Sequence, residues 1–334
     1  MGTVVITGAD SALGRRVAAL VERDPAAVAV ALGAGDRPVD LARDDVKPHL
    51  EGADVLVHLA VTRPATPTAA TDDVEAARRT FDAAGAAGVR HLVVLSSATV
   101  YGAWANNPVP LTEDAPLRPN PGVPFAAERA EIERLAAEWR DTHPGTTVAV
   151  LRPVRTVAPD DRDWLVPALR PAPAAPAEAE DPPAQYLHLD DLAAAVDLAR
   201  TARLDGAFNV APPGSIPGEA VRALIGAPPK VPLPGRVAGR AVRWGWRSGL
   251  GATPPELVPY VLQPWVVASD RLRARGWSAS VSNEEACVDA HEVSPWASLS
   301  PRRRQELALA VAGVGLAGAL AAAGVVVRRA VRRR

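Results

Sequence analysis

The stretch TVVITGADSALGRRVAALVE, Thr3–Glu22, decides the fold, because an apolar strand pattern runs through a small-residue turn into a helix pattern. A helix N-terminus in this setting offers free N–H groups and a positive dipole end to a pyrophosphate. Gly8 permits the tight turn, and Gly14 allows close helix–sheet packing. Ser11 occupies the middle position of the pattern, where the backbone must approach the phosphate. Its Cβ narrows the space for the phosphate, while its hydroxyl could donate a hydrogen bond to it. The stretch predicts a dinucleotide-binding turn, although an ordinary strand–turn–helix fits the same letters.

Strand and helix patterns alternate through the first half of the chain, which predicts an α/β fold with a parallel sheet and crossover helices. Each predicted strand is a short, nearly continuous apolar run, as expected where helices cover both faces of a sheet. The predicted strands are Thr3–Thr7, Val28–Leu32, Val55–Ala60, His91–Ser96 and Thr147–Arg152. The predicted helices lie near 13–23, 72–87, 124–140 and Asp190–Ala199, and an acidic cap opens the last of them.

The composition of the second half changes several times, which suggests how the chain is divided. Residues 167–184 are rich in Pro and Ala and predict a surface loop within a large domain that covers 1–212. Residues 213–291 alternate Pro-rich loops with short helix patterns and predict a smaller C-terminal substrate lobe. Residues 292–306 read as a polar linker to a hydrophobic segment at 307–327.

That hydrophobic segment, Leu307–Val327, carries no charge and is flanked by arginines on both sides. About 20 apolar residues suffice to cross a bilayer, and a helix apolar on every face belongs in lipid or in a core. A soluble, Ala-rich surface helix is the alternative, and a re-entrant or leaflet-bound helix also stays open. We expect a cytoplasmic domain that this helix attaches to the inner face of a membrane, with no signal peptide before the first strand.

Charge and composition exclude several classes of function. The formal net charge of −1 gives no electrostatic case for a nucleic-acid partner. Cys287 is the single cysteine, so a disulfide and a thiolate metal site are excluded. The six histidines show no metal-ligand spacing, and we expect no metal site.

Several short motifs occur in order along the chain. They are TGxxxxLG at 7–14, HLA at 58–60, SSATVYG at 96–102, LRP at 151–153 and HLDDLA at 188–193. Together they resemble the extended short-chain dehydrogenase/reductase family, the NAD-dependent epimerase/dehydratase group. SSATVYG is similar to the same stretch in UDP-galactose 4-epimerases, and DRLRARGW, Asp270–Trp277, resembles that family's final helix. The resemblance covers roughly residues 1–291.

The resemblance implies a doubly wound, Rossmann-type sheet with a nicotinamide dinucleotide across its carboxyl edge. Asp36, about 20 residues beyond Gly14, is the candidate for the ribose-binding acid. An aspartate favours NAD, whereas the adjacent Arg37 could lie over the adenine or accept the 2′-phosphate of NADP. We therefore expect NAD or NADP, with NAD favoured. Asp40-Leu41 fits the family's adenine-framing pair by type, but only GAGDRPV separates it from the second strand, which predicts a curtailed adenosine pocket.

The resemblance also implies which residues contact the cofactor. These are Thr7, Gly8, Ser11, Ala12, Leu13, Gly14, Asp36, Arg37, Asp40, Leu41, Leu59, Ala60, Arg129 and Pro153.

Catalysis in the family uses a tyrosine that transfers the substrate proton, a lysine one helical turn later that supplies positive charge, and a serine that orients the substrate oxygen. Ser97 fits the serine position, although a strand-end serine that bonds backbone is the simpler alternative. The family's Tyr-x3-Lys-x3-Glu pattern maps onto Phe125, Arg129 and Glu133. Phenylalanine cannot transfer a proton, while arginine keeps the charge but does not donate its proton. No Tyr-x3-Lys occurs anywhere in this chain.

Other residues offer weaker substitutes for the missing acid. Tyr101 could swing towards the nicotinamide, and Glu128 could act as an acid, although we expect Glu128 to face water. His188 and Asp191 resemble an element that joins the two lobes, which makes a structural role the expectation. The tryptophans of the smaller lobe are interpreted as its core; they are Trp244, Trp246, Trp265 and Trp277.

Two functions therefore remain open from the sequence. The first is an NAD(P)-linked oxidoreductase or nucleotide-sugar epimerase/dehydratase with altered catalytic residues. The second is a catalytically inactive dinucleotide-binding sensor or scaffold. The partner is a small-molecule substrate or none, and a homodimer stays open.

Overall fold

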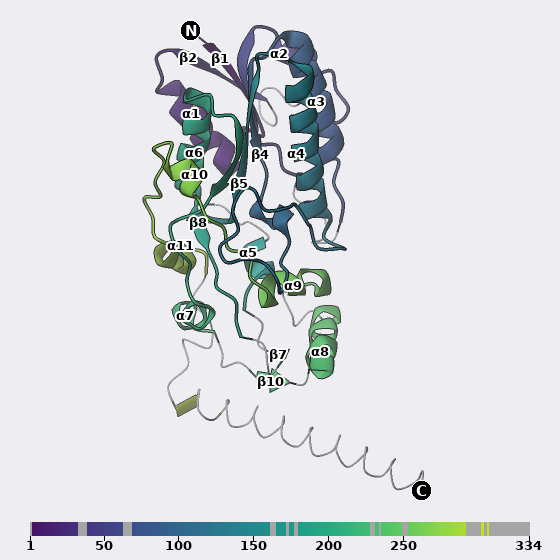
Figure 1. The fold of residues 1–334 in the computed structure, drawn as a ribbon, viewed down its shortest axis with the longest axis vertical. Coiled ribbons are helices and arrows are strands. Elements are labelled where there is room, and N and C mark those ends of the chain that lie inside the picture. The colour runs from purple at the N-terminus through teal and green to yellow at the C-terminus, as the bar shows by residue number, and fades with distance from the viewer. Residues whose placement is uncertain are drawn as a thin grey trace, which may run out of the picture.

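A parallel sheet of six strands, among the residues that the structure describes, forms the centre of the molecule (Figure 1). The computed structural model describes residues 2–32, 39–62, 69–160, 165–171, 174–176, 180–227, 231–233, 235–248, 253–291, 302–303 and 306. The strands are β1 (Gly2–Thr7), β2 (Ala27–Leu32), β3 (Ala53–His58), β4 (His91–Leu95), β5 (Thr147–Pro153) and β9 (Gly206–Val210). Their order is β2-β1-β3-β4-β5-β9, and every neighbouring pair is parallel.

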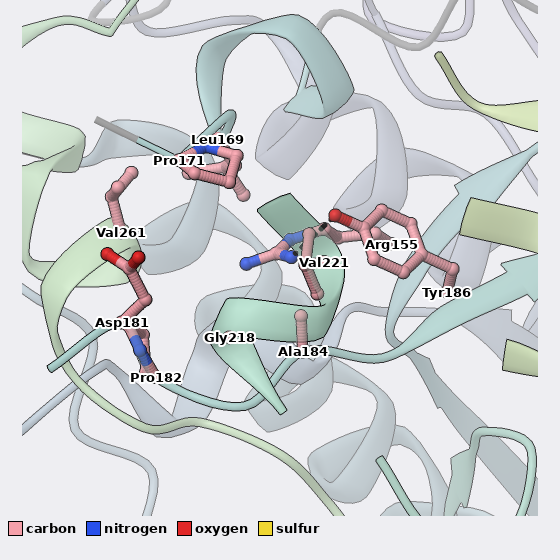
Figure 2. Close-up of a pocket in the computed structure, with 10 residues that line it drawn as sticks. All are labelled: Arg155, Leu169, Pro171, Asp181, Pro182, Ala184, Tyr186, Gly218, Val221 and Val261. Carbon is pink, nitrogen blue, oxygen red and sulfur yellow. Dashed lines mark hydrogen bonds between the residues drawn. The ribbon is translucent and has the colours of Figure 1, made fainter. Parts of the chain in front are cut away.

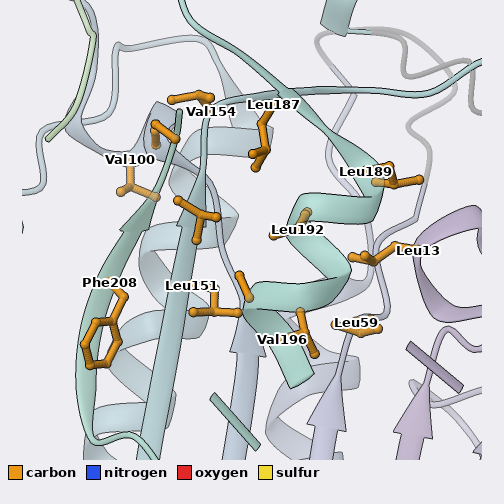
Figure 3. Close-up of a cluster of buried hydrophobic side chains, with 14 of the residues drawn as sticks. Leu13, Leu59, Val100, Leu151, Val154, Leu187, Leu189, Leu192, Val196 and Phe208 are labelled. Carbon is orange, nitrogen blue, oxygen red and sulfur yellow. The ribbon is translucent and has the colours of Figure 1, made fainter. Parts of the chain in front are cut away.

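Helices cover both faces of the sheet, which confirms the predicted doubly wound, Rossmann-type α/β fold (Figure 1). One layer contains α1 (Ala12–Glu22) and α6 (Leu189–Thr201), and the other contains α2 (Lys47–Leu50), α3 (Asp73–Ala87) and α4 (Pro124–Thr142). Each face has its own apolar core, because the strands present side chains alternately to the two sides. Figure 3 shows side chains of α6 meeting the strands in the first of these cores.

The passage from β2 to β3 is short, as the sequence predicted. Its described part, residues 39–52, contains turns and the four-residue helix α2, and no strand. In the sheet β2 therefore pairs only with β1 and forms one edge.

A third, smaller core lies beyond the carboxyl edge of the sheet (Figure 1). It includes β6 (Arg155–Val157), which pairs in parallel with β8 (Tyr186–His188), together with α7 (Gly218–Leu224) and α11 (Asn283–Asp289). The remaining elements are α5 (Leu165–Ala168), β7 (Ala174–Pro176), β10 (Val231–Leu233), α8 (Gly235–Arg247), η2 (Pro255–Leu257), α9 (Val258–Leu262) and α10 (Asp270–Arg273). This core takes residues from both sides of position 212, and the domain boundary expected there stays a prediction.

Two expectations about the second half need correction. The stretch 167–184 is not loop throughout, because it includes the end of α5 and the strand β7, which pairs with β10. Trp265 and Trp277 are buried as core residues, but Trp244 is 65% exposed and Trp246 is 36% exposed, because α8 turns both towards solvent.

The expected membrane attachment is contradicted. Within the described part of the chain, no helix combines the length and the apolar character needed to cross a membrane. The predicted segment Leu307–Val327, on which the expectation rested, lies outside the described residues, as does the predicted linker apart from 302–303 and 306.

A buried charged network fastens α4 to the sheet. The Glu133 carboxylate accepts a hydrogen bond from Ser96 Oγ at 2.5 Å and pairs with the Arg152 guanidinium at 2.6 Å. Arg152 Nη1 donates to the Tyr101 hydroxyl at 2.7 Å, and that hydroxyl donates to Asn209 Oδ1 at 2.7 Å. Burial raises the pKa of Tyr101 to about 12, so the phenol stays protonated in this position. All five side chains are buried, so each polar group depends on its partners here.

We expect Arg152→Met to lower the free energy of unfolding by about 3–5 kcal/mol, because Glu133 is then left as a buried charge without its partner. Arg134→Met is the matched control. Arg134 lies on the same helix and pairs with Glu131 at the surface, where about 1 kcal/mol or less is expected. Urea denaturation at pH 7 measures both, and equal losses would contradict a structural role for the buried pair.

Candidate functional site at the carboxyl edge of the sheet

The strand order reverses between β1 and β3, because the chain crosses β1 on its way from β2 to β3. The carboxyl ends of β1, β3, β4 and β5 consequently open at one edge of the sheet. Ligands of doubly wound sheets bind in the crevice outside such strand ends. The predicted site residues that the structure describes are placed relative to this edge below.

The turn after β1 has the shape that the glycine pattern predicted. Gly8 has φ of +68°, and a Cβ there would come within 3.0 Å of the Ala60 backbone. A Cβ on Gly14 would collide with the Gly8 carbonyl oxygen. Both positions therefore require glycine, and the turn brings the N-terminus of α1 against the end of β3.

The Ser11 hydroxyl, which the sequence offered as a possible hydrogen-bond donor to a phosphate, makes two hydrogen bonds within this turn. Its Oγ accepts a hydrogen bond from Gly14 N at 2.9 Å, as the N-cap of α1, and donates to Gly8 O at 2.7 Å. The backbone N–H groups of Ala12 and Leu13 have no hydrogen-bond partner among the described residues. These two donors, at the positive end of the α1 dipole, fit a bound phosphate.

Arg129 lies on α4 with its side chain fully buried. It pairs with Asp73 at the start of α3, and the Asp73 carboxylate also accepts the Thr62 N–H at 3.0 and 3.1 Å. The Arg129 Nε and Nη1 atoms are buried and make no hydrogen bond within the described structure. The Phe125 ring, one turn earlier, has its centroid 5.5 Å from Arg129 Cζ. Burial lowers the pKa of Arg129 and Asp73 opposes that shift, so the guanidinium keeps its charge.

His58 ends β3 beside this cation. Its Nδ1 lies 3.0 Å from Thr7 Oγ1, and its ring meets the Phe81 ring edge-on at 5.3 Å. Burial, and then the charge of Arg129, lower the pKa of His58 to about 3, so the imidazole is neutral. Thr7 is one of the residues predicted to contact the cofactor, and its hydroxyl faces His58.

Ser97 is buried directly after β4, as the N-cap of the 3-10 helix η1 (Ala98–Tyr101). Its Oγ accepts hydrogen bonds from Thr99 N at 3.2 Å and Thr99 Oγ1 at 3.0 Å. This is the backbone-bonding arrangement that the sequence left open as the simpler alternative. The Ser97 hydroxyl proton has no acceptor among the described residues, so it is the part of this side chain that a ligand could use.

The two substitutes for the missing acid are both held elsewhere. The Tyr101 hydroxyl is fixed between Arg152 and Asn209 and is not directed to the crevice. Glu128 does not face water as expected; it is buried, and it accepts hydrogen bonds from Thr71 N at 2.7 Å and Thr71 Oγ1 at 2.9 Å. Its charge therefore stabilises the chain before α3.

The other predicted cofactor residues divide into three groups. Asp36 and Arg37 lie outside the described residues. Asp40 is exposed and pairs with Arg43 at 2.7 Å, a hydrogen bond that lowers its pKa, while Leu41 beside it is partly buried. Leu59, Ala60 and Pro153 stand at the carboxyl ends of β3 and β5, as the motifs require. The assignment of these residues to a cofactor stays a prediction.

Elements outside the crevice have structural roles. His188 caps α6 through a hydrogen bond from Asp190 N, and Asp191 accepts from Ser280 N at 2.8 Å and Val281 N at 3.1 Å. These bonds tie α6 to the segment just before α11. The sequence analysis did not identify Asp73 as the partner of Arg129. The stretch TDDVE at 71–75 is typical of an acidic helix start, and no neighbouring residue indicates a contact with Arg129.

Comparisons with known proteins agree with this fold. A family model described as the NAD dependent epimerase/dehydratase family matches residues 4–211. A search of curated proteins found no match.

Solved structures resemble the chain over most of its length. A short-chain dehydrogenase/reductase superfamily protein from Agrobacterium tumefaciens with bound NAD has 22% identity and a TM-score of 0.63, over 92% of this chain and 98% of that one. MoeE5 in complex with UDP-glucuronic acid and NAD has 20% identity and a TM-score of 0.63, over 86% and 97%. A tyrosine-to-phenylalanine mutant of UDP-glucuronic acid 4-epimerase from Bacillus cereus, in complex with a UDP-4-deoxy-4-fluoro-glucuronic acid and NAD, has 14% identity and a TM-score of 0.62, over 86% and 97%. At these identities the likeness shows the fold.

The depressed pKa of His58 makes a prediction for acid stability. An unfolded histidine titrates near 6.5 and the folded one near 3, so the unfolded state takes up the proton first as the pH falls. The contribution of His58 to the free energy of unfolding is constant above about pH 6.5. Between about pH 6.5 and pH 3 it falls by about 1.4 kcal/mol for each unit by which the pH is lowered. We expect His58→Asn to lose stability less steeply than wild type between pH 6 and 4, by about that amount per unit. Urea denaturation at each pH measures the slopes; parallel curves would contradict the assignment.

Proposed function

Because the chain belongs to the NAD-dependent epimerase/dehydratase family, we propose that it binds NAD at the carboxyl edge of its sheet without the family's tyrosine-dependent proton transfer. The observation that carries this proposal is the pair on α4, Phe125 packed against the fully buried Arg129. Arg129 keeps the positive charge that the family's lysine supplies, while Phe125 lacks the proton-transferring hydroxyl of the family's tyrosine.

Support for cofactor binding comes first from the turn after β1. The unpartnered N–H groups of Ala12 and Leu13 would hold the pyrophosphate at the N-terminus of α1. Their donor geometry suits phosphate oxygens, since Gly8 and Gly14 let the backbone come close. The Ser11 cap contributes by fixing the turn. NAD, when bound, supplies hydride transfer.

Arg129 supports the nicotinamide half of the site. The family places a lysine here that binds the nicotinamide ribose, and two guanidinium nitrogens of Arg129 remain without hydrogen bonds in the described structure. Asp73 holds the third, which fixes the direction of the side chain. Arg129 would therefore bind and orient ribose hydroxyls, but it would not act as an acid.

The absence of ordinary turnover rests on what surrounds Phe125. A phenyl ring has no exchangeable proton, and the described groups that might replace a tyrosine, Tyr101 and Glu128, are engaged in buried hydrogen bonds. General acid–base catalysis contributes about 10²–10⁴-fold in enzymes, so its loss leaves binding largely intact while it slows chemistry. The solved tyrosine-to-phenylalanine epimerase mutant holds NAD and a sugar-nucleotide analogue. On this proposal the chain is a dinucleotide-binding sensor or scaffold with a degenerate active site.

An NAD-linked oxidoreductase or epimerase with altered chemistry is the second candidate, and Ser97 favours it. The hydroxyl proton of Ser97 has no acceptor among the described residues, so the serine could still orient a substrate oxygen. In both readings the small-molecule partner is a sugar nucleotide or another carbonyl or hydroxyl compound. A homodimer is proposed only by analogy with the family.

The double variant Phe125→Tyr, Arg129→Lys distinguishes the two functions. We expect wild type to bind NADH, seen as enhanced nicotinamide fluorescence, and to convert neither UDP-glucose nor UDP-glucuronic acid into another sugar nucleotide in the presence of NAD, as measured by NMR of the anomeric protons. The double variant should turn over at least about 100-fold faster than wild type, because the acid is restored.

Ser97→Ala provides the control. In the double-variant background it should remove the new activity while NADH binding persists. Wild-type turnover that Ser97→Ala abolishes would overturn the inactive reading and establish the second candidate. Failure of wild type to bind NADH would overturn the proposal itself.

A further inference from the structure

Helix α8, Gly235–Arg247, carries a row of arginines on its solvent side. Arg240, Arg243 and Arg247 are all exposed. Their spacing of three and four residues places them on one face of the helix, over about 10 Å of its axis. None of the three pairs with a carboxylate or makes a side-chain hydrogen bond among the described residues. The row is therefore a strip of positive charge that the described part of the fold does not compensate.

Two tryptophans border this arginine strip, one on each side. Trp244 follows Arg240 by four residues and precedes Arg247 by three, so it lies beside both on the helix surface. Trp246 follows Arg243 by three residues and borders the other side. Trp244 is 65% exposed, the largest fraction for any large hydrophobic side chain in the described structure, and Trp246 is 36% exposed. Exposed apolar side chains that gather in this way mark a contact surface.

The opposite side of α8 is already used by the fold. The helix packs against β7 and η2, and Val242 and Gly245 on that side are partly buried. In η2 the one carboxylate is that of Glu256, which is exposed and pairs with no described α8 arginine. Figure 1 shows α8 at the end of the molecule opposite to the start of β1. The arginine strip thus faces outward at one end of the molecule.

The arginine strip is an open helix surface, because no described α8 residue lines any of the described pockets. Figure 2 shows one of these pockets, which Arg155 and Val261 line together with residues of α7. Arg155 is 6% exposed there, between the rings of Tyr186 and Trp265. The cavity volume is about 20 Å³, which suits a water molecule. A partner of α8 therefore has to present a broad surface of its own, since no cavity beside the strip admits a ligand.

Charge and aromatic content together favour an anionic phospholipid surface as that partner. The planar fork of arginine matches phosphate oxygens, and an indole is suited to the headgroup level, where its ring is in an apolar environment and its N–H is wet. A basic helix with tryptophans is typical of peripheral contact with membranes. A nucleic acid draws on many phosphate contacts, whereas the formal net charge of −1 offers little positive charge beyond this strip.

We propose that α8 docks the protein on an anionic phospholipid surface, with the arginine strip on lipid phosphates and the two indoles at headgroup level. The contact is peripheral, because a helix of 13 residues is too short to span a bilayer and its apolar side is packed against the lobe. It agrees with the finding that no described helix can cross a membrane. It is also independent of cofactor binding, because α8 contributes no predicted cofactor contact.

Vesicles of phosphatidylcholine, with and without an equal share of phosphatidylglycerol, test the role of charge. We expect the full-length wild type to bind the anionic vesicles at least about 10-fold tighter than the neutral ones in co-sedimentation. Raising NaCl from about 0.05 to about 0.5 M should remove most of that difference, because salt screens exposed charges. Equal affinity for the two kinds of vesicle, or an affinity that salt does not change, would overturn the proposal.

Replacing the arginine strip by glutamines tests the site itself. The triple variant Arg240→Gln, Arg243→Gln, Arg247→Gln should weaken binding to anionic vesicles about 100-fold, because each arginine near an anionic surface contributes about 5-fold in affinity. The Tm should stay within about 2 °C of wild type, since the three side chains are exposed and unpaired in the described structure.

A control variant with the same change of net charge separates the strip from the charge of the whole protein. It replaces three exposed arginines of other elements, each paired with a carboxylate, by glutamine: Arg134, Arg140 and Arg273. We expect it to weaken vesicle binding by less than about 5-fold. Equal weakening by the two triple variants would show that net charge is responsible, and the proposal fails.

The tryptophans report the position of the lipid. In anionic vesicles that contain brominated phospholipid, the tryptophan emission of wild type should be quenched. The double variant Trp244→Phe, Trp246→Phe should lose most of that quenching, because Trp139, Trp265 and Trp277 are buried. Unchanged quenching in the double variant would place the lipid elsewhere on the chain and overturn the proposal. This result does not depend on whether the arginine variants fold.

A nucleic-acid arm completes the test. A labelled single strand of about 20 nucleotides replaces the vesicles, and binding is followed by fluorescence anisotropy at the same salt. We expect the strand to bind at least about 10-fold more weakly than the anionic vesicles. Tighter binding of the strand, lost in the α8 triple variant, would assign the arginine strip to nucleic acid and overturn the lipid proposal.

Discussion

The buried ion pair between Arg129 and Asp73 is the constraint on which the crevice depends. It joins α4 to the start of α3, and through the Thr62 N–H it also fixes the chain that leaves β3. A second buried pair, Glu133 with Arg152, lies one turn further along α4 and ties it to β5. Because removing one partner of such a pair leaves an uncompensated buried charge, the two pairs hold α4 in one register against the sheet.

This arrangement explains why the chemistry of the site and its stability are linked. Phe125, Arg129 and Glu133 follow each other at four-residue spacing, so they share the buried face of α4. In that position an arginine reaches Asp73 and keeps two buried nitrogens without hydrogen bonds among the described residues. The Phe125 ring lies against the same cation. A tyrosine at this place would add a hydroxyl, the group that transfers the proton in the family.

The spacing of apolar residues and glycines along the sequence was sufficient to predict the fold and the turn after β1. It was not sufficient to predict the buried ion pairs. The limits of five strands, the α1 turn and the short passage after β2 depend on neighbouring residues, and the sequence predicts them closely. The sixth strand of the sheet, β9, was not predicted. The partner of Arg129 lies 56 residues away, and no periodicity links the two. The same reason explains why Glu128 was wrongly expected to face water, because its partner Thr71 lies 57 residues away. Trp244 is the opposite case: an apolar side chain that was expected in the core is exposed in the fold.

Charge compensation separates the structural arginines from those that face a ligand. Arg152 and Arg200 are saturated by carboxylates of this chain, so their positions are explained by folding alone. Arg129 is only partly compensated: one of its three guanidinium nitrogens pairs with Asp73, and two make no hydrogen bond among the described residues. Arg155 has no carboxylate within the described structure and lies between two aromatic rings at the wall of a pocket. A buried charge that folding does not compensate reduces stability, and natural sequences keep such groups mainly where function uses them. Arg152 is thus explained by folding alone, whereas folding leaves Arg129 only partly compensated among the described residues.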